Sequence, residues 1–171
     1  MHGARQVAVS GVLIRRTHVD DAEAMTELRR REAVARFIYS YPSDRVDRVR
    51  AFIANLGPHN HSFVAELDGR VVGMAGLHVR QGKLRHSGFV ALGVHDAFHG
   101  RGIGRALMDQ LLDLADRWLG LLRVDLTVLD DNHKAQRLYE QLGFVVEGTQ
   151  RKAVFVDGAY HDVLMMARIK D

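Results

Sequence analysis

Cysteine is absent from the sequence. Disulfide bonds and thiolate metal sites are therefore excluded, and nothing in the chain points to an oxidising compartment. Long apolar runs are absent too, because no run approaches the roughly 20 residues that a membrane span needs. The opening stretch MHGARQVAVSG is short and contains Arg5, which argues against a signal peptide. We therefore expect a cytoplasmic protein with no membrane partner.

Proline is scarce as well, with only two in 171 residues, and no repeat or low-complexity segment interrupts the chain. A chain of this length fits one domain, which we place at residues 3–171. An excess of one charge is also missing, since 24 Lys and Arg face 21 Asp and Glu, for a net charge of +3. The arginine-rich stretches at 29–31 and 45–50 also contain acids or adjoin them. We expect solvated helix faces there and no nucleic-acid partner.

Hydrophobic periodicity predicts the elements. Apolar residues at helical spacing favour helices, and alternating or β-branched runs favour strands. The expected helices cover about residues 20–35, 45–56, 103–118 and 132–142, and the expected strands cover 12–16, 62–67, 71–79, 86–94, 122–128, 145–147 and 159–169. This order predicts an α+β fold, with a mixed, mostly antiparallel sheet of about seven strands flanked by about four helices.

The stretch HGRGIG, residues 99–104, joins an apolar strand to an amphipathic helix and has three glycines in five positions. Helix N-termini bind anions, and glycine lets the backbone approach closely. A Walker loop would need Lys and a hydroxyl residue where Arg105 and Ala106 stand. A dinucleotide fingerprint would need glycine where Leu107 stands, and its acidic partner would end a strand, whereas Asp125 falls inside one. A tight turn without a ligand remains the structural alternative.

The stretches HGRGIGRALM and DLTVLDDNHKAQRLYEQLGFVVEG together resemble the GNAT acyltransferase superfamily. Its acetyl-CoA loop reads Gln/Arg-x-x-Gly-x-Gly/Ala, with an Asn near the start of the next helix and a Tyr before x-x-Leu/Phe-Gly-Phe. The matching residues here are Gly102, Gly104, Asn132, Tyr139, Gly143 and Phe144. His99 departs from the pattern, which has Gln or Arg there. Because most of the expected binding comes from backbone amides, this departure should change the affinity for the cofactor without abolishing binding.

The resemblance covers about residues 62–169. It implies that acetyl-CoA is the cosubstrate, that no metal takes part, and that a homodimer is one option. The residues it assigns to cofactor binding are Leu92, Val94, His99, Arg101, Gly102, Ile103, Gly104, Arg105 and Asn132. The stretches EGTQRKAVFVDGAYHDVLMMARI and SYPSD are similar to bacterial L-amino-acid N-acyltransferases of the phenylalanine/methionine type.

Transfer of an acetyl group to an amine needs a proton donor for the departing thiolate. In the resembled family, the tyrosine at the position of Tyr139 sits beside the thioester sulfur, so we assign it that role; a core aromatic is the alternative. The strand before the glycine loop contains no carboxylate, which leaves His86 as the candidate base. His59 and His61 have no third ligand at matching spacing, so we expect no metal site.

The resemblance also implies that the loop after the first helix flanks the acceptor groove. Phe37, Tyr39 and Tyr41 cluster there and suit an apolar side chain, although a core or dimer role is open. The expected activity is transfer of an acetyl group to the primary amine of a small molecule, best an apolar L-amino acid. The alternatives are acetylation of a peptide or protein N-terminus, or a catalytically silent CoA-binding module.

Overall fold

The computed structural model describes Val9 and residues 11–170, so residues 3–8, residue 10 and residue 171 of the predicted domain lie outside the described residues. Its strands are β1 (Val12–Arg16), β2 (Asn60–Leu67), β3 (Arg70–Val79), β4 (Ser87–Val94), β5 (Arg123–Leu129), β6 (Val145–Val156) and β7 (Ala159–Ile169). Its α-helices are α1 (Ala22–Arg30), α2 (Glu32–Ile38), α3 (Val46–Ala54), α4 (Ile103–Asp113) and α5 (His133–Gln141).

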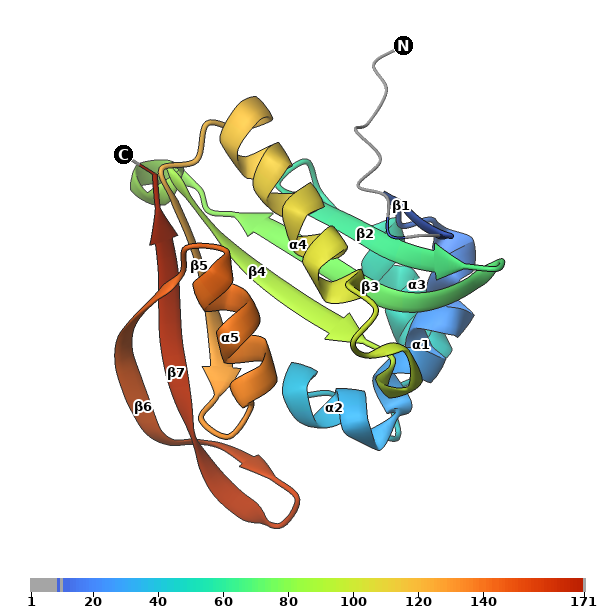
Figure 1. Ribbon diagram of the computed structural model, residues 1–171. Coiled ribbons are helices and arrows are strands. Elements are labelled where there is room, and N and C mark those ends of the chain that lie inside the picture. The colour runs from blue at the N-terminus through green and yellow to red at the C-terminus, as the bar shows by residue number, and fades with distance from the viewer. Residues whose placement is uncertain (1–8, 10, 171) are drawn as a thin grey trace.

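All seven strands belong to one sheet, in the order β1-β2-β3-β4-β5-β7-β6. Every neighbouring pair is antiparallel except β4 and β5. These two strands pair in parallel only where Ser87–Phe89 meets Arg123–Asp125. Beyond Phe89 the strands diverge, as Figure 1 shows, and the sheet opens toward the C-terminal end of β4.

Helices cover both faces of the sheet. In Figure 1, α4 and α5 lie in front of it and α1 and α3 lie behind it. The front core contains Leu107 and Leu111 of α4 packed with Leu77 and Val90 of the sheet. The rear core packs residues of α1, α2 and α3 against Val64 and Met74. The α+β fold with a seven-stranded mixed sheet is confirmed.

Local signals in the sequence explain several boundaries. Asp68 and Gly69, with φ of 50° and 75°, form the tight turn between β2 and β3, since such turns need positive φ at both central residues. Gly143, with φ of 87°, follows the end of α5, where a left-handed residue closes a helix. In the part of the chain that the structure describes, no helix is long and apolar enough to cross a membrane.

Two element predictions were wrong. Residues 20–35 do not form one helix, because Arg31 has an extended backbone (φ −64°, ψ 126°) that separates α1 from α2. Arg31 binds Asp96, with its Nε 2.6 Å from the carboxylate, and this ion pair anchors the break beside the end of β4. The described residues therefore contain five α-helices rather than four. The strand expected at 145–147 extends to Val156 because β6 pairs along the full β7 hairpin.

Candidate active site

A cavity of about 770 Å³ occupies the opening between β4 and β5. Residues Phe89–Val94 of β4 and Thr127–Leu129 of β5 line it. The diverging strands therefore enclose the middle of the cavity, which we call its waist. One arm lies between α4 and α5, and the other lies under α1, α2 and α3 on the opposite face of the sheet. Two molecules that enter from opposite faces would therefore meet at the gap in the sheet.

The front arm ends at the N-terminus of α4. Gly102 caps this helix in the left-handed conformation, with φ of 78°. The following residues, Ile103, Gly104 and Arg105, line the cavity. The first turn of the helix contains no acidic residue, and the cap makes no side-chain hydrogen bond. Backbone amides and the positive end of the helix dipole are therefore available for an anion.

Gly104 has a different role from Gly102. A Cβ atom at Gly104 would lie 3.5 Å from Leu138, 3.6 Å from Leu92 and 3.8 Å from Val94. These are ordinary contact distances, so an alanine would fit but would occupy part of the passage between α4, α5 and β4. The glycine keeps the passage open at the point where a ligand chain would run from the helix N-terminus to the gap.

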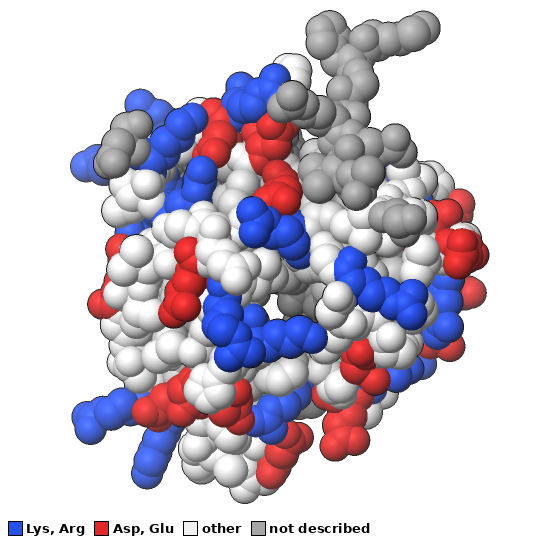
Figure 2. Space-filling model, viewed as in Figure 1, with Lys and Arg blue, Asp and Glu red and all other residues white. Residues whose placement is uncertain are grey.

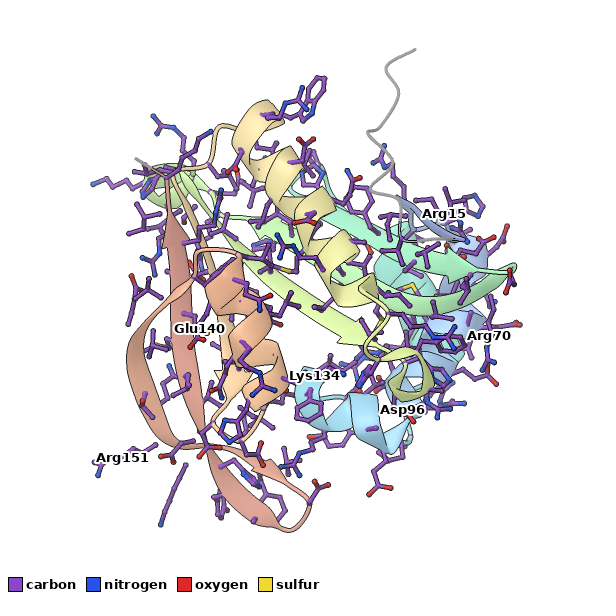
Figure 3. The ribbon with its side chains drawn as sticks, in the orientation of Figure 1. Arg15, Arg70, Asp96, Lys134, Glu140 and Arg151 are labelled. Atoms are coloured by element: carbon purple, nitrogen blue, oxygen red, sulfur yellow. The ribbon has the colours of Figure 1, made fainter. Side chains whose placement is uncertain are left out.

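Basic side chains surround this arm. Arg105, Lys134 and Arg137 line the cavity, and Figure 2 shows Lys and Arg gathered around a hollow in the middle of this face. Figure 3 labels Lys134 between the start of α5 and α2. Asn132 caps α5, with its side chain accepting a hydrogen bond from the backbone N–H of Ala135 at 3.3 Å. The positive charge and the free amides together suit a phosphate-bearing ligand.

Tyr139 comes from α5 and is only 7% exposed. Burial and, to a smaller extent, the neighbouring Tyr39 raise the pKa of its phenol to about 12. The ring packs against Phe144, with 5.9 Å between the ring centroids. Because a raised phenol pKa favours the neutral form, Tyr139 carries its proton throughout the physiological range.

The rear arm is mostly apolar. Phe37 from α2, together with Phe52 and Leu56 from α3 and the turn that follows it, forms its walls. Tyr39 ends α2 with a left-handed backbone, φ 56°, which turns its side chain toward β5. Burial raises the pKa of the Tyr39 phenol, and a hydrogen bond with Thr127 partly offsets that rise. The hydroxyl groups of Tyr39 and Thr127 thus lie at the waist of the cavity, near Tyr139.

Most of the predicted site residues meet in this cavity. Those that line it are Phe37, Tyr39, Leu92, Val94, His99, Gly102, Ile103, Gly104, Arg105, Asn132 and Tyr139. Arg101 lies outside the lining and places its guanidinium over the ring of Phe98, at 5.2 Å. Tyr41 also lies outside it and is 68% exposed.

His86 does not reach the cavity. It is exposed and precedes β4 at the end where β4 and β5 are still paired, and its carbonyl accepts hydrogen bonds from the backbone N–H groups of Leu122 and Arg123. The gap opens at the other end of the strand, so the structure gives no support to His86 as the base. His99 lines the cavity, and its Nε2 lies 2.9 Å from the carbonyl oxygen of Val94, which closes the loop before α4.

Several residues that line the cavity were not predicted from the sequence, namely Arg29, Asn60, His78, Thr127, Lys134 and Arg137. Lys134 and Arg137 are three residues apart on a helix that begins at the Asn132 cap, so a helical projection from that cap would have found them. No local signal marks the other four. Long-range strand pairing brings Asn60, His78 and Thr127 to the cavity, and packing of α1 against the sheet brings Arg29 there.

Comparison with known proteins agrees with this geometry. Residues 22–144 match the Acetyltransferase (GNAT) family. The L-amino acid N-acetyltransferase AaaT of Escherichia coli is 33% identical over 95% of this chain and 100% of its own length. The N-alpha-acetyltransferase RimI of Mycobacterium tuberculosis is 39% identical over 60% of this chain and 63% of its own length.

Solved structures show the same architecture. The yncA protein of Salmonella typhimurium, a putative acetyltransferase solved with its cofactor acetyl-CoA, superposes with a TM-score of 0.82 at 27% identity, covering 95% of each chain. A GCN5-related N-acetyltransferase from Kribbella flavida gives 0.82 at 27% identity, covering 94% of this chain and 98% of that one.

A sheet that opens between β4 and β5, with a free helix N-terminus on one side and a pocket on the other, defines an acyl-CoA-dependent transferase. The chain belongs to the GNAT acetyltransferase family. It is an N-acetyltransferase with acetyl-CoA as its cosubstrate. The residues present fit that cosubstrate: the uncapped amides of α4 and the cations Arg105, Lys134 and Arg137 suit its phosphates.

Proposed function

We propose that this enzyme acetylates the α-amine of a small apolar L-amino acid. The observation that carries the proposal is the composition of the rear arm. Its walls are apolar and aromatic, including Phe37 and Phe52, and no Asp or Glu is found among the described residues that line the cavity. Burying a Phe or Met side chain there would contribute about 1.5–3 kcal/mol of binding free energy.

The absence of a lining carboxylate also bears on the charge of the acceptor. At pH 7, deprotonation costs about 4.6 kcal/mol for a lysine-like amine and only about 1 kcal/mol for a peptide-like α-amine. Polyamines and lysine side chains would in addition need acidic partners for their charge. The α-amine of a free amino acid lies between these two limits, because its own carboxylate raises the pKa of the ammonium group above that of a peptide terminus. It still needs less help than a lysine-like amine, and the similarity to AaaT points the same way.

Arg29 supports an acceptor that carries a carboxylate. It lines the rear arm from α1, and Asp44, which is buried, accepts a hydrogen bond from its Nε at 2.8 Å. The terminal NH groups of the guanidinium remain donors that the carboxylate of a free amino acid can accept from. The α-carboxylate is the group by which the enzyme can distinguish a free amino acid from a simple amine.

Acetyl-CoA supplies the acetyl thioester when it is bound. We infer that the amides after Gly102 and the surrounding cations hold its phosphates, while Leu92, Val94 and Asn132 flank its chain. Tyr139 is the proposed donor of a proton to the departing thiolate. Because its pKa is about 12 and a thiol's is about 8.5, this transfer is uphill by about 5 kcal/mol, which lies well within an enzymatic barrier.

The decisive experiment is an acceptor screen that reads CoA release from acetyl-CoA across free amino acids, their amides, dipeptides, spermidine and lysine peptides. We expect turnover with Phe or Met and none with spermidine. Preference for spermidine or lysine peptides would contradict the proposal. No CoA release with any amine would favour a silent CoA-binding module.

Acetylation of a peptide or protein N-terminus is the second candidate, supported by the 39% identity to RimI. A peptide's first side chain would fill the same apolar arm, but its carboxylate would be absent beside Arg29. Turnover of dipeptides and their amides at rates above those of free amino acids would favour this candidate.

A further inference from the structure

The rear face of the sheet carries a histidine beside the opening. His78 on β3 stands directly opposite Asn60 on β2 and Phe89 on β4. Side chains alternate between the two faces of a strand, so these three share a face with Met74, which packs in the rear core. All of them line the cavity. His61 shares the other face with its partner Leu77, which packs in the front core, so its ring points away from the rear arm.

The surroundings of His78 fix which ring nitrogen carries the proton. Its Nδ1 lies 2.7 Å from Oδ1 of Asn60. An amide oxygen only accepts hydrogen bonds, so Nδ1 donates its proton to Asn60. In the neutral ring, Nε2 then has a free lone pair. This is the nitrogen that can accept a proton, and the exposed side chain reaches the space under α2 and α3.

The position of His78 along β3 places its ring beside the gap between β4 and β5. Phe89, the partner of His78, is the last β4 residue that pairs with β5. His78 therefore stands at the level where the gap opens, one strand away from it. An acceptor amine that enters through the rear arm reaches the gap beside this ring. Because no Asp or Glu in the described part of the chain lines the cavity, His78 is placed to accept the proton that a carboxylate would otherwise take.

The charged groups around His78 are paired. Arg29, from α1, is bonded to Asp44. Two residues beyond His78, just after the end of β3, Arg80 is bonded to Asp125, and Arg123 bridges Asp125 and Glu147. The Tyr39 phenol, whose pKa is raised by burial, also lines the cavity. The neighbourhood is therefore close to neutral, and the ring can gain a proton during turnover without facing an unpaired cation.

We propose that His78 is the general base and that Asn60 is its positioning residue. This inference rests on the proposed function only in needing an amine acceptor, whichever amine it is. The ammonium proton of the acceptor passes to Nε2 of His78, directly or through one water. The amine nitrogen then forms the amide bond to the acetyl carbon as the carbon–sulfur bond breaks. The thiolate takes the proton of Tyr139, which recovers one from the second N–H of the attacking nitrogen, so one proton is released overall.

The first test is His78→Gln, assayed with the best acceptor from the screen. We expect kcat/KM at pH 7 to fall about a hundredfold, as for loss of a general base, while the Kd of acetyl-CoA stays the same. The loss should shrink to less than about tenfold at pH 9.5, because more of the amine is then neutral without help. His59→Gln, an exposed histidine outside the cavity, is the matched control and should behave as wild type.

Asn60→Asp tests the positioning role. A carboxylate beside Nδ1 favours the protonated ring, so the acidic limb of the kcat/KM profile should move to higher pH. Asn60→Ala should lower kcat without moving the Kd of acetyl-CoA. A residue with a purely structural role would not shift the limb.

The two proposals fail in different ways. If the screen finds spermidine to be the substrate, the amino-acid proposal is wrong and the His78 variants are assayed with spermidine. A wild-type rate and pH profile in His78→Gln would overturn the base assignment while leaving the substrate intact, as would a loss confined to His86→Gln. Nitrogen NMR of the imidazole gives a readout without turnover: we expect Nδ1 protonated in the neutral ring, and a proton on Nε2 would contradict the proposal.

Discussion

Arg80, the residue that follows β3, donates two hydrogen bonds of 2.7 Å each to Asp125 of β5 across the start of β4. The pair is partly buried, with the side chains 30% and 15% exposed. It lies where β4 and β5 are still paired, immediately before they separate. The bonds therefore hold together the closed end of a sheet whose other end must stay open.

Asp125→Ala should lower the free energy of unfolding by about 1–3 kcal/mol, because it leaves the guanidinium of Arg80 partly buried without its partner. Asp113→Ala is the control, since Asp113 forms an exposed pair with Arg117 on one helix and its loss should cost less than about 0.5 kcal/mol. Chemical denaturation of both variants measures the difference. Equal losses would show that the pair across β4 adds nothing beyond a surface contact.

Gly102→Ala should weaken acetyl-CoA binding. Gly102 has φ of 78°, which an alanine adopts at a cost of about 1–2 kcal/mol, so the first turn of α4 would shift to relieve the strain. Gly69→Ala introduces the same strain at φ of 75° in the β2–β3 turn, away from the cavity. Both variants should lose similar stability in thermal melts. Only Gly102→Ala should raise the Kd of acetyl-CoA in calorimetry, and equal Kd values would contradict the phosphate-binding role of the loop.

Gly104→Ala should raise the stability of the protein, whereas Gly102→Ala should lower it. Gly104 lies in the first turn of α4 outside the left-handed region, and alanine favours a helix by up to about 1 kcal/mol over glycine. The added methyl group narrows the passage beside Leu138 and Leu92. We therefore expect a higher Tm together with weaker acetyl-CoA binding. A higher Tm with unchanged binding would show that the ligand does not pass this point.

Tyr139→Phe should lower kcat about ten- to hundredfold and leave the Kd of acetyl-CoA nearly unchanged. The pH dependence follows from the raised pKa. Since the neutral phenol is favoured up to a pKa of about 12, raising the pH from 7 to 10 does not remove the proton of Tyr139. Wild-type kcat should therefore show no fall in that range from this residue. A fall that is present in wild type and absent in Tyr139→Phe would contradict the raised pKa, and an unchanged kcat in Tyr139→Phe would contradict the role of proton donor.

Much of the fold follows from local patterns in the sequence. The turn at Asp68 and Gly69, the end of α5 at Gly143 and the glycine loop before α4 each need a backbone conformation that their residues supply. The break at Arg31 could not be predicted in this way, because no residue around it marks a helix end, and its ion pair with Asp96, 65 positions further along the chain, exists only in the folded protein. For the same reason, only some of the residues that line the rear arm were predicted from the sequence. Phe37 and Tyr39 stand out as local aromatics, whereas His78 and Asn60 gain meaning only when β2 pairs with β3.

Arg29 provides the sharpest test of the substrate. If its guanidinium donates hydrogen bonds to the carboxylate of a free amino acid, the wild-type enzyme should prefer phenylalanine to phenylalaninamide. A charge-assisted hydrogen bond contributes about 1.5–3 kcal/mol, which corresponds to a preference of roughly ten- to hundredfold in kcat/KM. Arg29→Gln should abolish most of this preference by lowering the rate with the acid and sparing the rate with the amide.

The ratio of kcat/KM for two substrates on one enzyme does not depend on how much of the variant folds. This control matters because Asp44 is buried and loses its partner in Arg29→Gln. A preference that survives the substitution would place the carboxylate elsewhere in the rear arm. A wild-type preference for the amide would favour a peptide N-terminus as the natural acceptor.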